Sequence, residues 1–367
     1  MDKIGETVLE IDLDALAHNF QYLKSKLLPN TKFMAVVKAF AYGSDMVAIA
    51  KKMESLGIDY FAVAYVKEGC LLRESGITPP ILVLHPQPVN FEALIQHNLE
   101  PSLYSPKILR QFLSTAEEKG LEQYPVHIKF NTGLNRLGFW ESDVNYISKQ
   151  LENRNELKVT AILSHLAASE DSNEKEFSKN QIETFKKISA DLCEKLGYRP
   201  FRHMLNTSGI INYPDAQFEM VRSGIGLYGY GNSVLEDENL KPVAQLKTII
   251  SQIHKIEPGE TVGYNRAFHS DGYRITATLP LGHADGIARQ YGNEAAYVIV
   301  NDKKAPIIGN VCMDMIMIDV TGIDCKEGDE VLVFGKANSA ETFASSAQTI
   351  SYEILTAISQ RVKRIIK

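Results

Sequence analysis

The sequence has 367 residues, of which 44% are hydrophobic and 23% charged, and its formal net charge is −6. These proportions exclude an intrinsically disordered chain, no apolar run reaches the ~18 residues that span a bilayer, and no Lys/Arg cluster indicates a nucleic-acid partner. At roughly 150 residues per domain, the length indicates about two domains.

The first two thirds of the chain alternate short apolar runs with longer amphipathic stretches, the first of which begins at Asp12. The runs predict eight buried parallel strands, at Phe33–Val37, Tyr60–Tyr65, Ile81–Leu84, Leu99–Leu103, Val126–Phe130, Val159–Leu163, Arg202–Leu205 and Met220–Arg222. Helices are predicted between them, among others at Asp45–Ser55, Pro106–Lys119, Asp143–Leu151 and Glu174–Leu196. About eight β-then-α units predict a (β/α)8 barrel of the TIM type over residues 1–240. A doubly wound sheet stays open, because periodicity does not reveal strand order.

The pattern changes near Lys241, where the long amphipathic stretches end. Strands are predicted at Val243–Ile250, Tyr273–Leu281, Ala296–Val300, Ile307–Asp319 and Glu330–Phe334. Because no long helix intervenes, they indicate a mainly antiparallel β domain over residues 241–367. A closing helix is predicted at Thr342–Ser359, and the strand-like run Thr7–Ile11 is a candidate to join this domain.

The four cysteines and the amino terminus bear on the cellular compartment. Cys70, Cys193, Cys312 and Cys325 lie far apart and form no CxxC pair, which fits neither a zinc site nor a disulfide framework. We therefore expect reduced thiols and no metal centre. The first residues show no basic segment followed by an apolar one, so no secretory signal is visible and a cytoplasmic location is expected.

Five polar or charged residues fall at or just after the ends of predicted barrel strands: Lys38, Lys129, His165, Asn206 and Arg222. The carboxyl ends of barrel strands open onto one mouth, where such residues converge. Taken singly, a lysine after a strand is usually solvated and a histidine usually structural. The coincidence of five at matching positions favours a site.

Lys38 directly follows the apolar run Ala35–Val37. Desolvation lowers the pKa of such a lysine and makes its neutral amine available for a Schiff base. The residues alone leave three roles open: an anchor for pyridoxal phosphate, an aldolase nucleophile, or neither.

The segment Ala35–Gly43, which contains Lys38, resembles the cofactor-lysine motif of alanine racemases, pyridoxal-phosphate enzymes with a barrel and a β domain. Further motifs of that family follow in the same order, at Lys129–Gly138, Ser164–Ala167, Asn206–Ser208, Val221–Gly229, Val262–Tyr264, Gly282–Arg289 and Gly309–Asp314. The resemblance spans essentially the whole chain. It implies interconversion of L- and D-alanine with pyridoxal phosphate as cofactor, a reaction that supplies D-alanine for peptidoglycan.

The resemblance also implies a two-base mechanism in a homodimer. Lys38 would hold the cofactor as a Schiff base and act as the base on one face of the substrate Cα. Tyr264 would act on the opposite face, contributed across the dimer interface. A monomer should therefore be inactive.

Other residues would bind the cofactor. Arg222 would face the pyridine nitrogen, which a permanently charged guanidinium keeps unprotonated, and His165 would orient Arg222. The phosphate would be bound by Tyr42, Thr207 or Ser208, Gly224 and Ile225, with Asn206 beside the phosphate or ring.

Three residues would contact or organise the substrate. Arg136 would lie near the cofactor phenolic oxygen and the substrate carboxylate, and Lys129 would hold Arg136 in position. In the family this lysine is often carbamylated, which turns a cation into an anion. Met313 would contact the substrate through its backbone N–H, although core packing explains a methionine there nearly as well.

Three positions depart from the family pattern. Phe40 replaces a usual Asn, His283 a frequent Tyr, and Gln360 a Tyr that contacts the phosphate and narrows the entrance. The alternatives are therefore a broader amino-acid racemase, a basic-amino-acid decarboxylase of the same fold and, outside enzymes, a pyridoxal-phosphate carrier. Arg222 argues against the decarboxylase, whose chemistry favours a carboxylate at the pyridine nitrogen. The second domain argues against the carrier.

Overall fold

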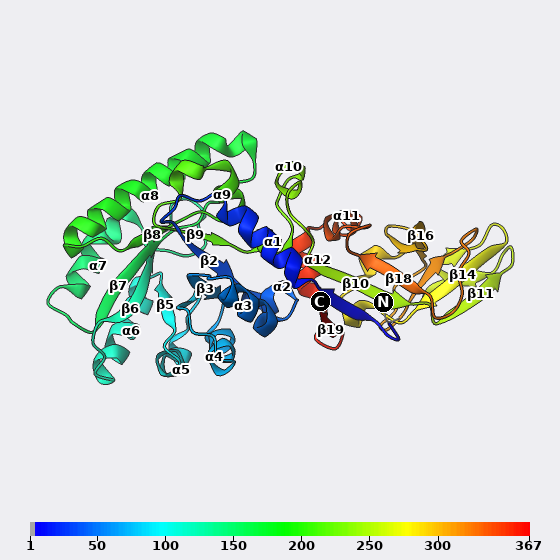
Figure 1. Cartoon of the computed structure of the whole chain (residues 1–367), viewed down its shortest axis with the longest axis horizontal. Coiled ribbons are helices and arrows are strands. Elements are labelled where there is room, and N and C mark those ends of the chain that lie inside the picture. Colours follow the sequence, from blue (N-terminus) through cyan, green and yellow to red (C-terminus); the bar gives the residue numbers. More distant parts are fainter. Residues whose placement is uncertain (1–3) are drawn as a thin grey trace. The chain divides into compact units, whose positions relative to one another are not determined.

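The computed structural model describes residues 4–367, which form two compact units (Figure 1). The barrel unit contains Ala17–Ala41 and Met46–Leu240. The β unit contains Tyr42–Asp45, Lys241–Lys367 and residues 4–16. The β unit therefore draws on three separate stretches of the chain.

Eight parallel strands close the barrel in chain order, with β2 paired to β9. They are β2 Lys32–Val36, β3 Tyr60–Val63, β4 Ile81–Val83, β5 Glu100–Leu103, β6 Tyr124–Lys129, β7 Leu157–Leu163, β8 Phe201–His203 and β9 Met220–Ser223. Strands buried on both faces appear in a sequence as continuous apolar runs, which is why these eight were recognisable. The closed barrel confirms the predicted (β/α)8 fold and excludes the doubly wound sheet.

Helices lie around the outside of the barrel strands (Figure 1). The α-helices between Leu13 and Asp237 are α1 Leu13–Lys24, α2 Lys38–Tyr42, α3 Met46–Ser55, α4 Val66–Glu74, α5 Phe91–Gln96, α6 Pro106–Glu118, α7 Val144–Leu151, α8 Lys175–Leu196, α9 Thr207–Asn212 and α10 Val234–Asp237. Helix α6 shows how they form: Ser105 caps the first turn by accepting from Ile108 N at 3.3 Å, and Pro106 occupies the first position. Its buried residues recur at three- and four-residue spacing, so one face packs inward.

The β unit is built on a nine-stranded sheet in the order β11-β14-β17-β16-β15-β18-β10-β1-β19. The strands are β1 Val8–Ile11, β10 Ala244–Ile249, β11 Gln252–Ile256, β14 Arg274–Leu279, β15 Tyr297–Val300, β16 Lys303–Ile308, β17 Ile316–Asp319, β18 Glu330–Phe334 and β19 Lys363–Ile366. A ribbon of β12 Thr261–Val262 and β13 Phe268–His269 accompanies them. Only β1 and β19 pair in parallel, so the predicted mainly antiparallel domain is confirmed.

Two predicted elements of the β unit were wrong. The run Ile307–Asp319 is two strands, β16 and β17, separated by a loop that begins at Gly309, whose φ is +64°. The predicted helix Thr342–Ser359 is two helices, α11 Ala340–Ser345 and α12 Ser351–Ala357, with Gln348 at φ +57° between them. Left-handed backbone ends an element without any change in hydrophobicity, so periodicity does not detect it.

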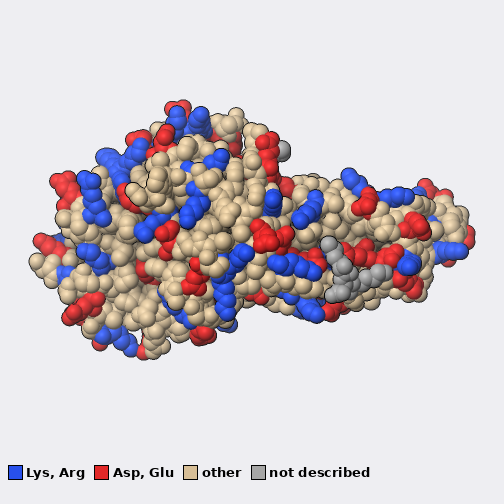
Figure 2. All heavy atoms as spheres, viewed as in Figure 1, with Lys and Arg blue, Asp and Glu red and all other residues tan. Residues whose placement is uncertain are grey.

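No helix within residues 4–367 is both long and apolar enough to cross a bilayer. On the face displayed in Figure 2, Lys and Arg side chains are interspersed with Asp and Glu. That face therefore carries no patch of a single charge.

Candidate active site

The five residues selected at strand ends lie at the carboxyl ends of β2, β6, β7, β8 and β9. Lys129 is 7% exposed, and its pKa is lowered to about 8 by burial and by the charges of Arg136, Arg222 and Lys38. Lys38, Lys129 and Arg222 all stand at carboxyl ends of barrel strands and the charge of Arg136 acts on Lys129, so the four cations belong to one mouth. Among the described residues, none of the four forms an ion pair with a carboxylate, which suits an anionic ligand.

Lys38 begins a left-handed turn. The next four residues, Ala39 to Tyr42, have φ between 53° and 54°, a conformation that costs about 1–2 kcal/mol per residue that is not glycine. Glu68 of α4 stabilises its start, because its carboxylate accepts from Ala39 N at 2.6 Å and from Ala64 N at 2.7 Å. Burial, and next the charge of Arg136, lower the pKa of Lys38. The turn thus presents a lysine whose amine is readily neutral.

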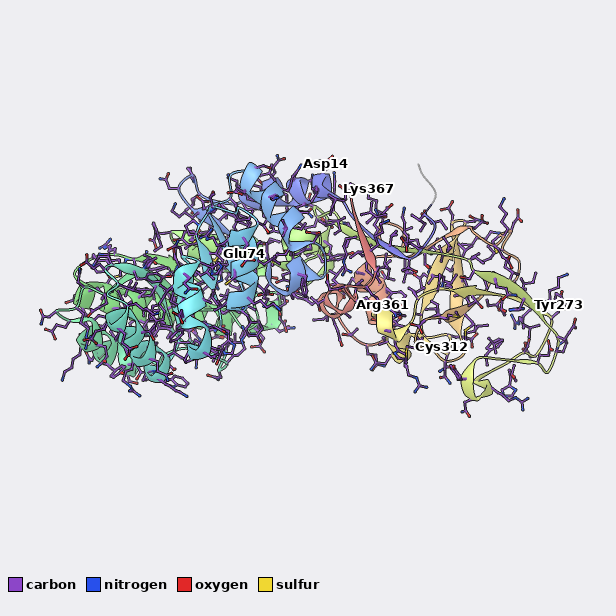
Figure 3. All side chains as sticks on the ribbon, turned by 90° about the horizontal axis from the view of Figure 1, so that it is seen from below. Asp14, Glu74, Tyr273, Cys312, Arg361 and Lys367 are labelled. Atoms are coloured by element: carbon purple, nitrogen blue, oxygen red, sulfur yellow. The ribbon has the colours of Figure 1, made fainter. Side chains whose placement is uncertain are left out.

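We expect Glu68→Ala to lower the free energy of unfolding by about 2–3 kcal/mol, because three backbone N–H groups lose a charged acceptor. Urea unfolding would measure the change. Glu74→Ala is the matched control, since Glu74 (labelled in Figure 3) lies on the same helix and, within residues 4–367, forms an ion pair only with His97, at 3.4 Å. Equal stability of the two variants would contradict the role of Glu68.

Arg222 is 4% exposed and donates to several acceptors. Its Nη2 donates to Ser164 O at 2.7 Å, Met204 O at 3.1 Å and His165 Nδ1 at 3.1 Å, while Nη1 donates to His203 O at 3.1 Å and to His203 Nδ1. Its Nε makes no hydrogen bond to another described residue. Burial lowers the pKa of Arg222 only to about 10, so the group is a cation at neutral pH with one donor left for a ligand.

His165 is neutral in this arrangement. Burial, and next the charge of Arg222, hold its pKa well below the ordinary value. Its Nδ1 accepts from the guanidinium, so the proton of the neutral ring lies on Nε2.

Two buried backbone donors lie at the end of β9. Gly224 and Ile225 are buried, and neither N–H donates to another described residue. The neighbouring Gly226 N donates to Thr207 Oγ1 at 3.2 Å, and a Cβ on Gly226 would lie 2.5 Å from Thr207 Cγ2. Buried N–H groups are nearly always paired, so this pair fits an anion.

The polar side chains of α9 are largely engaged. Asn206 caps the helix by accepting from Gly209 N at 2.9 Å. The Ser208 hydroxyl donates to Glu236 at 2.9 Å and accepts from Asn232 at 2.7 Å. Of the two predicted hydroxyls, Thr207 therefore lies next to the buried N–H groups, whereas Ser208 is committed elsewhere.

Tyr42, Tyr264 and Met313 belong to the β unit. Tyr42 is buried, its ring lies 6.0 Å from that of Tyr352, and burial raises its pKa. Tyr264 is 73% exposed and Met313 is 59% exposed. Both side chains therefore lie at the surface of the β unit.

An ion-pair cluster supports the loop that carries Met313. Arg361, which directly follows Gln360, binds Asp285 at 2.7 Å and Asp314 at 2.6 Å. Figure 3 labels Arg361 and, in the same loop as Asp314, Cys312. Gly282 faces the loop so closely that a Cβ would lie 2.3 Å from Cys312 O. The loop geometry is therefore set within the β unit.

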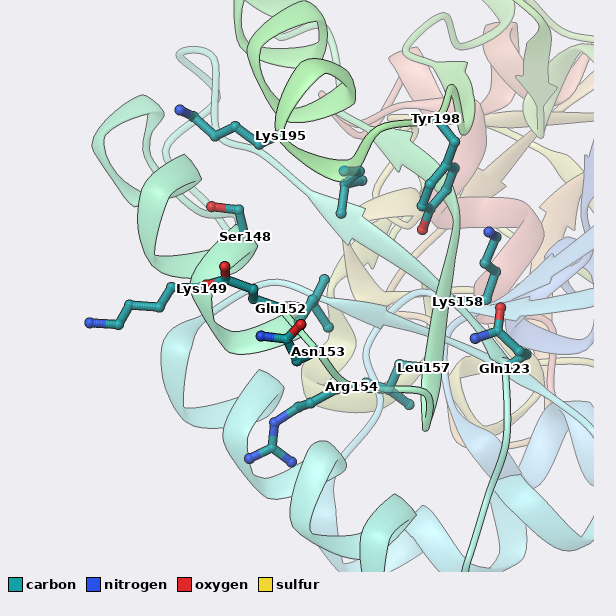
Figure 4. Close-up of a pocket in the computed structure, with 12 residues that line it drawn as sticks. Gln123, Ser148, Lys149, Glu152, Asn153, Arg154, Leu157, Lys158, Lys195 and Tyr198 are labelled. Carbon is teal, nitrogen blue, oxygen red and sulfur yellow. The ribbon is translucent and has the colours of Figure 1, made fainter.

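Figure 4 shows a different pocket, of about 550 Å³, near the amino ends of β6 and β7. Each cationic residue that lines this pocket has a structural reason to be there. Lys149 and Lys195 lie in the last turns of α7 and α8, where cations favour the helix dipole. Lys158 lies 3.6 Å from the Tyr198 ring centroid, and Arg154 pairs with two glutamates. None of the sequence-predicted site residues lines it.

Comparison with known proteins identifies the family of the chain. The family model for the alanine racemase N-terminal domain matches residues 11–232, and that for the C-terminal domain matches residues 243–366. The chain belongs to the alanine racemase family. The alanine racemase of Thermodesulfovibrio yellowstonii is 38% identical over 366 residues, covering 97% of this chain and 96% of that protein.

Solved alanine racemases share the fold. One from Clostridium difficile 630 has a TM-score of 0.93 at 32% identity and covers 100% of this chain and 97% of its own. Another, from Bartonella henselae, was solved with covalently bound pyridoxal phosphate; it has a TM-score of 0.89 at 30% identity and covers 99% of this chain and 100% of its own. The likeness extends over both units.

Sequence reasoning missed two residues of this alanine racemase family site. His203 lies inside β8, where a single histidine in an apolar run predicts core packing, and only its neighbour Arg222 on β9 reveals its contact. Glu68 lies in the first turn of α4, five residues after β3 ends at Val63, and only the fold shows that its carboxylate reaches the turn after Lys38. The one signal available was a glutamate at the third position of a helix, three residues after the residue that caps it.

Proposed function

We propose that the chain interconverts L- and D-alanine with pyridoxal phosphate as cofactor. The observation that carries this is the donor set of one mouth: the desolvated Lys38, the free Nε of the buried Arg222 and the unpaired N–H groups of Gly224 and Ile225. These groups match an aldehyde, a ring nitrogen and a phosphate. When bound, the cofactor supplies an electron-withdrawing ring that acidifies the Cα–H of an amino acid.

Each part of the cofactor has a candidate binding group in the sequence. Lys38 Nζ would anchor it, Arg222 would face the ring nitrogen, and His165 would orient Arg222. The phosphate would be bound by the backbone N–H groups of Gly224 and Ile225. The family motifs add the side chains of Tyr42, Thr207 or Ser208, and Asn206.

Two bases would complete the reaction. Inversion at Cα requires one group to remove a proton and another to return it on the opposite face. Lys38 Nζ would serve one face and Tyr264 Oη the other. We further propose a homodimer in which Tyr264 and Met313 enter the partner's site, which their exposure supports, and we place the enzyme in the cytoplasm, where D-alanine for peptidoglycan is made.

Arg136 would bind the substrate carboxylate, and Lys129 would position Arg136 as a carbamate. The neutral Nζ of Lys129 adds to the carbon of CO2 and releases one N–H proton, so an anion replaces a cation beside Arg136. A pKa of about 8 makes the neutral amine available.

We expect one carbamate signal in the carbon NMR spectrum after equilibration with 13C-bicarbonate, more intense at pH 9 than at pH 7 for the same bicarbonate concentration. The increase with pH follows from the neutral fraction of Lys129, which rises as the pH passes through about 8. Lys129→Ala should lose the signal, and Lys149→Ala, an exposed lysine, should keep it. A signal that survives in Lys129→Ala would refute the carbamate.

A substrate comparison tests the proposed function against its nearest alternative. The purified holoenzyme is incubated with L-alanine, L-serine, L-lysine and L-arginine, and the enantiomers are separated by chiral chromatography. We expect D-alanine to form at least about tenfold faster than the other D-isomers. Comparable rates would favour a broader racemase, which His283 and Gln360 make the specific alternative, and release of CO2 from lysine or arginine would indicate a decarboxylase.

A further inference from the structure

A buried chain of hydrogen bonds runs from Arg222 through the barrel interior to Glu100. Arg222 Nη1 contacts His203 Nδ1, His203 Nε2 lies 3.1 Å from His127 Nδ1, and His127 Nε2 lies 2.8 Å from Glu100 Oε2. Both histidines are fully buried and Glu100 is 7% exposed. Glu100 is the first residue of β5, at the amino end of the strands, whereas the candidate active site lies at their carboxyl ends.

The position of every proton in this chain follows from its first link. A guanidinium only donates, so His203 Nδ1 must accept and the proton of His203 must lie on Nε2. His127 Nδ1 then accepts that proton, so the proton of His127 lies on its own Nε2 and is donated to Glu100. Burial, and next the Arg222 charge, hold the pKa of His203 well below its ordinary value, in agreement with a neutral ring. All donors point from Arg222 toward Glu100.

Arg222 needs a counter-charge that none of its direct contacts provides. Its acceptors are three backbone carbonyls and two neutral histidines. A buried cation without an opposite charge is strongly destabilising. The carboxylate at the far end of the hydrogen-bond chain is Glu100.

Glu100 has no stronger competing partner among the described residues. Tyr60 Oη lies 3.4 and 3.5 Å from its oxygens, long for an O–H···O bond. Tyr124 Oη donates to Leu99 O at 2.7 Å, and the Arg73 guanidinium donates to backbone carbonyls, so neither hydrogen-bonds to the carboxylate, although both lie within reach of its charge. The His127 contact is therefore its principal bond.

We propose that Glu100 is a positioning residue for Arg222, which supplies the counter-charge of the guanidinium through His127 and His203 and fixes its orientation. The hydrogen bonds from His203 to Glu100 fix the position of Arg222 Nη1, and Nε–H stays available for a ligand. A carboxylate in direct contact would form an ion pair that occupies guanidinium N–H groups, whereas one placed two imidazoles away offsets the buried charge and leaves Nε–H for a ligand. The inference rests on the proposed function only in the identity of that ligand, the ring nitrogen of the cofactor.

Glu100→Gln tests this, because the glutamine Oε1 still accepts from His127 while the charge is lost. In protein labelled with [15N]histidine, we expect His127 and His203 to be neutral with the proton on Nε2 in the wild type, and both resonances to move in Glu100→Gln. For the holoenzyme, we expect kcat for alanine to fall about tenfold with KM within about twofold. The absorption maximum of the bound cofactor should also shift. Glu118→Gln, an exposed change of the same charge on α6, should alter none of these.

Glu100→Asp separates charge from packing. If the charge matters, the shorter aspartate retains more kcat than the isosteric glutamine, whereas a merely structural side chain would be replaced better by glutamine. A His203 or His127 ring that is protonated, or carries its proton on Nδ1, in the wild type would overturn the proposal, as would unchanged resonances and kcat in Glu100→Gln. The NMR result does not depend on turnover. A wild type that makes no D-alanine would therefore refute the proposed function, while the spectra would still decide the role of Glu100.

Discussion

Lys38→Ala is expected to abolish racemisation and to remove the visible absorption band of bound pyridoxal phosphate. The variant loses the only amine that follows β2 directly into the left-handed turn, and with it both the anchor and one of the two bases. We expect kcat to fall by at least about 10³-fold. Chiral chromatography measures the first effect and an absorption spectrum of the purified protein the second.

The control is Lys51→Ala, an exposed lysine on α3 that leaves the mouth unchanged. Borohydride should fix the cofactor irreversibly to the wild type and to Lys51→Ala, and peptide mapping should locate it on Lys38. Cofactor fixed at another lysine, or a visible band retained by Lys38→Ala, would show that the anchor is assigned wrongly.

Tyr264→Phe is expected to lower racemisation by about 10²–10⁴-fold while cofactor binding is retained. The phenol is the second base of the proposal, and the residue is 73% exposed, so its loss should not disturb the core. In D2O, Lys38 still exchanges the Cα hydrogen on its own face, so deuterium should enter one enantiomer of alanine without inversion. Mass spectrometry combined with chiral chromatography resolves this.

Tyr273→Phe removes another exposed phenol of the β unit and should be fully active (Figure 3). Mixing the inactive Lys38→Ala and Tyr264→Phe proteins tests where Tyr264 acts. Random hybrid dimers contain one intact site each, so activity should return to about a quarter of the wild-type value. Unchanged turnover by Tyr264→Phe alone would rule out the two-base mechanism.

The barrel was predictable from the sequence because its strands are buried on both faces and its helices carry one apolar face. The site residues at strand ends were predictable for the same reason, since Lys38, Lys129 and Arg222 interrupt apolar runs at the right places. The left-handed turn after Lys38 could not be predicted, because Ala39 to Tyr42 contain no glycine that would indicate positive φ.

What the sequence could not reveal depends on partners far away in the chain. Glu100, His127 and His203 are separate polar residues inside three predicted strands, and each alone suggests a satisfied core residue. Their order as a relay exists only because β5, β6 and β8 place them in contact across the barrel. The split of Ile307–Asp319 into two strands was hidden for a related reason, because the apolar Val311 continues the pattern through a turn.

The most direct test of the account follows the two enantiomers of alanine separately. The purified protein, loaded with pyridoxal phosphate, is incubated with pure L-alanine and, in parallel, with pure D-alanine, and both mixtures are analysed by chiral chromatography over time. We expect both to converge on equal amounts of the two enantiomers, with total alanine unchanged. Enantiomers that remain pure, or alanine that is consumed without inversion, would contradict it.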